Sequence, residues 1–177
     1  MNLRYFVCRF MDEAERCIDK KMYLAALKVA LDLPMICATF NKGSKIDLRD
    51  YAAWCDEWVA SQVVRDASST DGISLADKIT ALYAKLNACE FYTTDNPLLN
   101  FKRLSLWTYK YKLKDTELAK FSYEIINSDG EEIAIAEVNW KFLIFELLNA
   151  ADDWLAKYGY EESSAFPYFG ITCNIDE

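Results

Sequence analysis

The longest apolar stretch of the chain lies between Met22 and Phe40 and reads MYLAALKVALDLPMICATF. One group of its residues keeps the spacing of a helix face, namely Met22, Ala25, Ala26, Val29, Ala30 and Leu33. Leu24, Leu27 and Leu31 cover most of the opposite face. A helix that is apolar nearly all round packs on several sides, so we expect the central helix of the core. Pro34 should kink or briefly interrupt it, because proline lacks an N–H and clashes with the preceding turn.

Four further segments also have the periodicity of amphipathic helices, at about 2–19, 48–64, 74–91 and 139–158. Ser74 and Asn139 are the expected N-caps of the last two. The buried stripe of the final helix is predicted to contain Trp140, Leu143, Ile144, Leu147, Leu148, Ala151 and Leu155.

A period of two replaces the helical period after residue 101. Lysines alternate with Tyr or Leu from 109 to 114, which is typical of a half-exposed strand. Residues 118–126 and 133–138 read as two more strands, and the NSDG sequence between them is a hairpin signal.

These elements predict a mainly α protein of the α+β class. It should be a helical bundle of about five helices, with a small antiparallel sheet inserted before the last long helix. We expect one domain over 1–177, with its helical part at about 2–92 and 139–158. The β insertion would occupy about 101–138 and a C-terminal tail 159–177.

The composition restricts the reactions, ligands and partners that the protein can support. The chain has 177 residues, a formal net charge of -8 and no histidine, so catalysis or metal binding through histidine is excluded. A strongly acidic domain repels phosphate backbones, which disfavours direct nucleic-acid binding and suits a basic protein partner. The six cysteines form no CxxC pair, so we expect buried free thiols rather than a zinc site or a disulfide framework. No metal or other cofactor is expected.

The beginning of the chain, MNLRYFVCRFMDEAER, is too polar for a signal peptide. We expect no apolar run to approach the ~20 residues of a membrane span. We therefore expect a cytoplasmic protein with no membrane contact.

The second and third helices carry a family likeness. Tyr23, Leu24, Ala26, Leu27, Ala30, Leu31, Pro34, Ile36 and Cys37 fit a YLxALxxALxxPDxCG pattern, and Arg49, Tyr51, Trp54 and Trp58 fit an aromatic RYxxWxxxW-like run. Together with the closing helix (Ala150, Ala151, Trp154 and Leu155), they make the chain resemble a bacterial group of HEPN-like proteins. The resemblance implies a helical and usually dimeric fold, and many HEPN proteins are RNases.

The active site of such RNases, Arg-x4-6-His, is missing here. The resemblance would place this motif near the end of the fourth helix, where the chain reads LNACEF. Leu86 occupies the position of the arginine, Phe91 occupies that of the histidine, and Asn87 lies between them. Neither Leu nor Phe can take a proton or stabilise developing charge, so we expect a degenerate site and no enzyme activity. The alternative is that this stretch was never a site and is only the end of a core helix.

Two charged groups could form surfaces. The first is basic and aromatic: its rings could stack on nucleic-acid bases, and its lysines could neutralise phosphates. Its members are Trp107, Tyr109, Lys110, Lys112 and Lys114. Lysines on an edge strand, however, more often serve to block aggregation between sheets. The carboxylate pairs Asp12-Glu13, Asp56-Glu57 and Asp152-Asp153 are expected on solvated faces, since consecutive helix residues point apart. Together these acids could form an interaction surface that imitates a phosphate backbone.

Two functions remain open at this stage. The first is a non-catalytic HEPN-like protein-interaction module, with a homodimer as one form, in the conflict between bacteria and mobile elements such as phages. The second is an acidic inhibitor, encoded by a phage or mobile element, that occupies the nucleic-acid channel of a basic host nuclease in the manner of anti-CRISPR or anti-restriction proteins.

Overall fold

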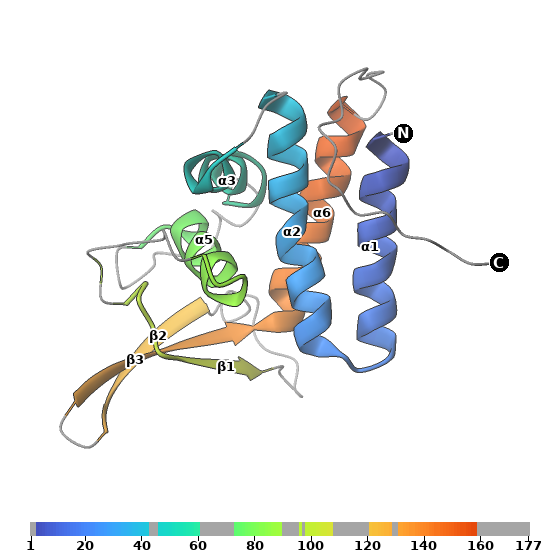
Figure 1. Cartoon of the computed structure of the whole chain (residues 1–177). Helices are drawn as coiled ribbons and strands as arrows, with labels where there is room; N and C mark the ends of the chain where they lie inside the picture. The colour runs from blue at the N-terminus through green and yellow to red at the C-terminus, as the bar shows by residue number, and fades with distance from the viewer. Residues whose placement is uncertain are drawn as a thin grey trace.

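The computed structural model describes residues 3–42, 46–60, 73–89, 96, 98–107, 121–128 and 131–158. Their elements follow one another as α1 (Leu3–Asp19), α2 (Tyr23–Lys42), α3 (Leu48–Cys55), η1 (Asp56–Ala60), α5 (Leu75–Leu86), β1 (Arg103–Trp107), β2 (Phe121–Ser128), β3 (Glu131–Asn139) and α6 (Trp140–Tyr158). Helices α1, α2 and α6 stand side by side, α3 and α5 lie beside α2, and the sheet lies below α5 (Figure 1). The prediction of a mainly α bundle with a small sheet before the last long helix is confirmed.

Helix α2 is central, as its apolar pattern predicts. It packs against α1, α3, α5 and α6, and Ala26, Leu27, Ala30 and Leu31 have no exposed surface. The helix continues through Pro34 to Lys42, so the predicted interruption is absent. Packing on several sides stabilises the turn that has lost the proline hydrogen bond.

The start of α2 departs from this pattern. Met22 lies just before the helix and is 52% exposed, while Leu24 is 49% exposed. The prediction that both residues face the core is wrong, because the first turn of α2 lies at the end of the bundle, where the chain turns from α1 into α2 (Figure 1).

By length and composition alone, α2 could also cross a membrane. It has 20 residues and a mean hydropathy of 1.5 over its most apolar window, and 56% of that window is buried within the protein. The sequence prediction that no apolar run approaches such a length is therefore wrong. A core helix of a soluble protein passes the same test, which makes this feature weak evidence for a membrane span.

The predicted helix over 48–64 begins at Leu48 but changes type at Cys55. Residues Asp56–Ala60 continue as the π-helix η1. Asp47 caps α3 with a side-chain oxygen that accepts from the backbone N–H of Asp50 at 3.2 Å. The Asp50 side chain in turn accepts from the backbone N–H of Asp47 at 3.1 Å. This capping box fixes the start of the helix that carries the first aromatic residues of the family-like run.

The caps predicted for the last two helices are confirmed. The Ser74 hydroxyl accepts from the N–H of Asp77 at 3.0 Å, and the Asn139 side chain accepts from the N–H of Phe142 at 3.1 Å. Each side chain satisfies an N–H group that the first turn of a helix leaves unpaired. Every residue of the stripe predicted for α6 is buried.

The three strands form a mixed sheet in the order β1-β3-β2. Strand β2 pairs antiparallel with β3, whereas β1 pairs parallel with it, from Arg103 opposite Ile135 to Trp107 opposite Asn139. The prediction of an antiparallel sheet is therefore wrong. Alternation of apolar and polar residues marks a strand but does not give its direction, and here β1 and β3 both run toward the start of α6.

Candidate functional site

The predicted degenerate site lies where α5 ends. The helix stops at Leu86, and not near Phe91, because Asn87 caps it: the backbone N–H and the side-chain amide of Asn87 both donate to the Tyr83 carbonyl, at 3.0 and 3.1 Å. Ala88 then turns the chain with a φ of 49°. Leu86 packs half-buried against the core. Phe91 lies outside the described residues. Leu86 and Asn87 thus have structural roles at the end of this helix.

The carboxylate pairs occupy three separate elements. Asp12 and Glu13 are exposed on α1, Asp56 and Glu57 on η1, and Asp152 and Asp153 on α6. Of these elements, η1 packs against α6. The structure thus brings two of the three pairs onto neighbouring elements.

Cations accompany these acids. The Arg16 guanidinium lies 4.0 Å from the Glu13 carboxylate, and the Lys157 amine lies 4.0 Å from that of Glu57. Lys157 also follows Asp153 by one helical turn, so it lies between the acids of η1 and those of α6. Exposed pairs of this kind stabilise little, but they break up the negative potential. The surface is therefore not a continuous array of carboxylates.

The predicted basic and aromatic strand lies largely beyond the described residues. Trp107 ends β1, while Tyr109, Lys110, Lys112 and Lys114 all fall outside them. Strand β1 itself, over 103–107, lies in the expected β insertion, and polar Arg103 and Ser105 alternate there with apolar Leu104 and Leu106. This short alternation did not lead us to predict a strand there.

The cysteines fit the prediction of free thiols. Cys8, Cys17, Cys37, Cys55 and Cys89 form no disulfide; Cys17, Cys37 and Cys55 are buried, whereas Cys8 and Cys89 are only partly buried. Cys173 lies outside the described residues. Burial raises the pKa of the Cys37 and Cys55 thiols well above the ordinary value, which keeps them protonated and unreactive. Among the described residues, no group of three or more acidic or cysteine side chains could hold a metal ion.

A cluster that sequence reasoning missed joins α2, α3 and α5. The buried Tyr51 hydroxyl donates to the Leu31 carbonyl at 3.0 Å, and its ring stacks on Tyr83 with centroids 4.5 Å apart. Burial raises the pKa of Tyr83 to about 12, with the negative charge of Asp32 adding to the effect. Burial also raises the pKa of Asp32, although Lys28 opposes the shift. Every cause that acts on the pKa of Tyr51 or Tyr83 raises it, so the cluster is better suited to packing than to proton transfer at neutral pH.

Aromatic rings also gather where η1 meets α6. Trp54 and Trp58 stack with centroids 6.4 Å apart, and the Lys157 amine lies 5.2 Å from the Trp58 ring centroid. The two buried indole N–H groups have no acceptor within the part of the chain that the structure describes. π-helical turns recur at functional sites, but neither indole N–H lies on an open surface.

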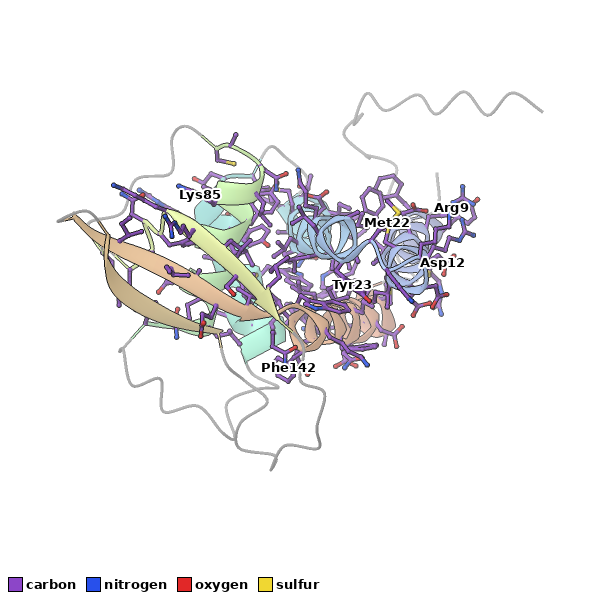
Figure 2. The ribbon with its side chains drawn as sticks, turned by 90° about the horizontal axis from the view of Figure 1, so that it is seen from below. Arg9, Asp12, Met22, Tyr23, Lys85 and Phe142 are labelled. Carbon is purple, nitrogen blue, oxygen red and sulfur yellow. The ribbon has the colours of Figure 1, made fainter. Side chains whose placement is uncertain are left out.

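Among the described residues, three of the five exposed large apolar side chains lie at the turn from α1 into α2. We call Met22, Tyr23 and Leu24 the apolar corner; they are 52%, 38% and 49% exposed. Tyr23 stacks on the buried ring of Trp140, with centroids 4.2 Å apart, which fixes the corner to the core. Figure 2 views the molecule from below and labels Met22 and Tyr23 at this end of the bundle. Successive helix residues point in different directions, so what the three share is their place at one end of the bundle. Exposed large apolar residues that gather in one place are candidates for a contact surface, unlike single scattered ones.

The chain matches no protein-family model, and neither the curated proteins nor the solved structures contain a match to it.

Proposed function

We propose that the protein is a non-catalytic protein-interaction module of HEPN-like design, which acts in the cytoplasm in the conflict between bacteria and mobile elements. The observation that carries the interaction role is the apolar corner, because its three side chains keep large apolar surface in water while one of them is anchored to the core. Burying such a patch against a partner would recover about 25 cal/mol for each Å².

The non-catalytic part rests on how the candidate chemical groups are used. Asn87 satisfies a helix carbonyl, Leu86 packs on the core, and burial raises the pKa of the Cys55 thiol. None of these groups is positioned to transfer a proton to or from a substrate. We propose no cofactor and no metal.

The test compares two matched substitutions in the full-length chain. Leu24→Lys places a charge in the apolar corner, whereas Tyr5→Lys places one on α1, at a residue that is 60% exposed and whose ring contacts the Arg9 guanidinium. Each variant is used as bait in a bacterial lysate and run on size-exclusion chromatography with light scattering. We expect Leu24→Lys to lose the partner or the homodimer and Tyr5→Lys to retain it.

Unchanged partners and an unchanged oligomeric state in Leu24→Lys would contradict the proposal. Cleavage of RNA by the purified protein without metal, abolished by one surface substitution, would contradict its non-catalytic part.

The alternative, an acidic inhibitor of a basic nuclease, is supported by the net charge of -8. It is weakened by Arg16 and Lys157, which interleave with the acids. The same lysate experiment separates the two functions. Recovery of a basic nuclease that is retained by Leu24→Lys and lost on Asp152→Lys would favour the inhibitor.

A further inference from the structure

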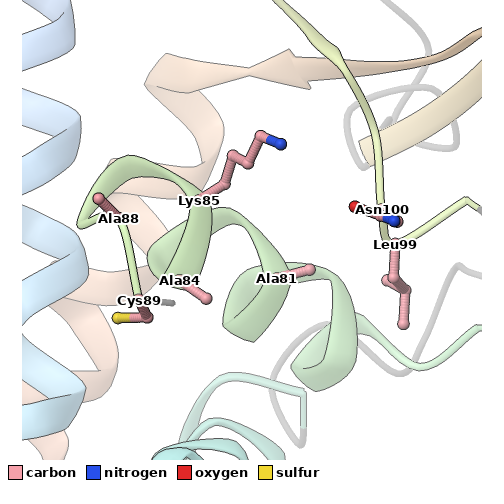
Figure 3. A pocket seen from close by; sticks show the side chains of 7 residues that line it. All are labelled: Ala81, Ala84, Lys85, Ala88, Cys89, Leu99 and Asn100. Carbon is pink, nitrogen blue, oxygen red and sulfur yellow. The ribbon is translucent and has the colours of Figure 1, made fainter. Parts of the chain in front are cut away.

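A small pocket lies between the last turns of α5 and the turn at 98–100 that leads to β1 (Figure 3). Its volume is about 260 Å³, which is below the range of drug-sized ligand sites and suits a single side chain. The pocket exists because three residues of the α5 side are alanines: Ala81, Ala84 and Ala88.

Two polar side chains sit on its rim. The Lys85 amine and the Asn100 side chain face each other across the opening in Figure 3. The Lys85 amine lies 5.9 Å from the centroid of the Phe101 ring, and that ring is buried. A cation over an aromatic face is held by the ring quadrupole, so this contact keeps Lys85 on the side of α5 that lines the pocket.

The charge around the pocket opposes that of the chain. Lys102 and Arg103 follow Phe101 directly and are both exposed, in a protein whose net charge is -8. In Figure 2, Lys85 lies on the sheet side of the molecule, away from Asp12 on α1. Lys85 is the cation that lines the pocket, and a cation beside apolar side chains is complementary to a carboxylate on a short aliphatic stem.

We propose that this pocket binds the carboxylate of a Glu or Asp side chain that a protein partner presents. The aliphatic stem would lie against Ala88 and Leu99, two apolar lining residues that keep exposed surface, while the carboxylate accepts from the Lys85 amine and the Asn100 amide. This inference rests on the proposed interaction role and adds a chemical class of partner to it. A phosphate backbone fits less well, because the rim supplies one cation and the net charge of the protein opposes a long polyanion.

The experiment is a titration of the full-length protein, labelled with ¹⁵N, followed by NMR. The probes are a short capped peptide of alternating Ala and Glu, its Gln counterpart and single-stranded oligo(U) RNA. We expect the amides of Lys85, Cys89 and Asn100 to shift saturably with the Glu peptide only. Lys85→Gln should weaken binding about fivefold, the effect of about 1 kcal/mol for an exposed charge pair.

Lys141→Gln is the matched control, because the Lys141 amine also lies 5.9 Å from an aromatic ring, that of Phe145, but away from the pocket. It should bind the peptide as the parent protein does. Equal weakening in both variants, equal binding of the Gln peptide, stronger binding of RNA, or no saturable shift would each overturn the proposal. The probes need no partner, so the result is independent of the apolar corner: Leu24→Lys should still bind the Glu peptide even if it loses the partner.

Discussion

The ring of Tyr23 stacks on the indole of Trp140, with centroids 4.2 Å apart and ring planes inclined by 23°. Tyr23 opens α2 and Trp140 opens α6, so this contact joins the first turns of two helices that are distant in the sequence. Because Trp140 is buried and Tyr23 is 38% exposed, one pair links the core to the apolar corner.

Removing the ring at Tyr23 should therefore affect stability as well as binding. Tyr23→Ala is expected to lower the free energy of unfolding by about 1–2 kcal/mol, because it deletes an aromatic pair and part of its apolar contact. Tyr23→Phe keeps the ring and should stay near the parent value. Urea unfolding followed by circular dichroism measures both. If Tyr23→Phe loses as much as Tyr23→Ala, the stack is not the stabilising contact.

Two leucines of α2 give a sharper contrast, three residues apart on one helix. Leu27 has no exposed surface, whereas Leu24 is 49% exposed. Leu27→Asp should unfold the protein, since a buried unpaired charge costs several kcal/mol of a total stability of about 5–15 kcal/mol. Leu24→Asp should remain folded. Thermal melts by circular dichroism distinguish them, and a soluble, cooperatively folded Leu27→Asp variant would contradict the central position of this helix.

The same two residues show what sequence periodicity can and cannot predict. The pattern around α2 correctly places Leu27 in the core, because burial along a helix follows its 3.6-residue repeat. It wrongly places Leu24 and Met22 there, because the repeat does not encode where neighbouring helices end. Exposure at the end of a bundle depends on the relative lengths of packed helices, and no single segment specifies them.

The direction of β1 and the position of the pocket could not be predicted from the sequence for a similar reason. The antiparallel pairing of β2 with β3 follows from the short sequence between them, but the parallel pairing of β1 with β3 depends on a long connection. The pocket joins Lys85 to Asn100 across fifteen positions of the chain. Local spacing could identify LNACEF as a candidate site near the end of a helix. It could not predict that the turn at 98–100 lies against the end of that helix.

The turn after α5 permits a test of local strain. Ala88 has a φ of 49°, a region that costs an L-residue about 1–2 kcal/mol and glycine almost nothing. Ala88→Gly is therefore expected to raise the free energy of unfolding by about 0.5–1 kcal/mol, less than the full strain because glycine also loosens the unfolded chain. Ala84→Gly, within α5, should lower it by about 1 kcal/mol or more. Destabilisation by both substitutions in urea unfolding would contradict the strain at Ala88.

Asp32 should make stability depend on pH. Burial raises its folded-state pKa above the ordinary 3.8, with Lys28 partly opposing the shift, so the folded protein holds this proton more tightly than the unfolded chain. Stability from the protonated group is full below about pH 3.8 and is lost as the pH rises through the raised pKa. Asp32→Asn should therefore unfold at a higher temperature than the parent at pH 7, and this difference should shrink toward pH 3.5.

Lys28 supplies the control for that effect. If its charge partly offsets the buried carboxylate, Lys28→Gln should lower the melting temperature at pH 7 in the parent but not in the Asp32→Asn background. A double-mutant cycle by scanning calorimetry at both pH values measures this coupling, which should disappear when Asp32 is protonated. A lower melting temperature of Asp32→Asn at pH 7 would mean that the ionised carboxylate makes a stabilising contact, which would contradict the raised pKa of Asp32.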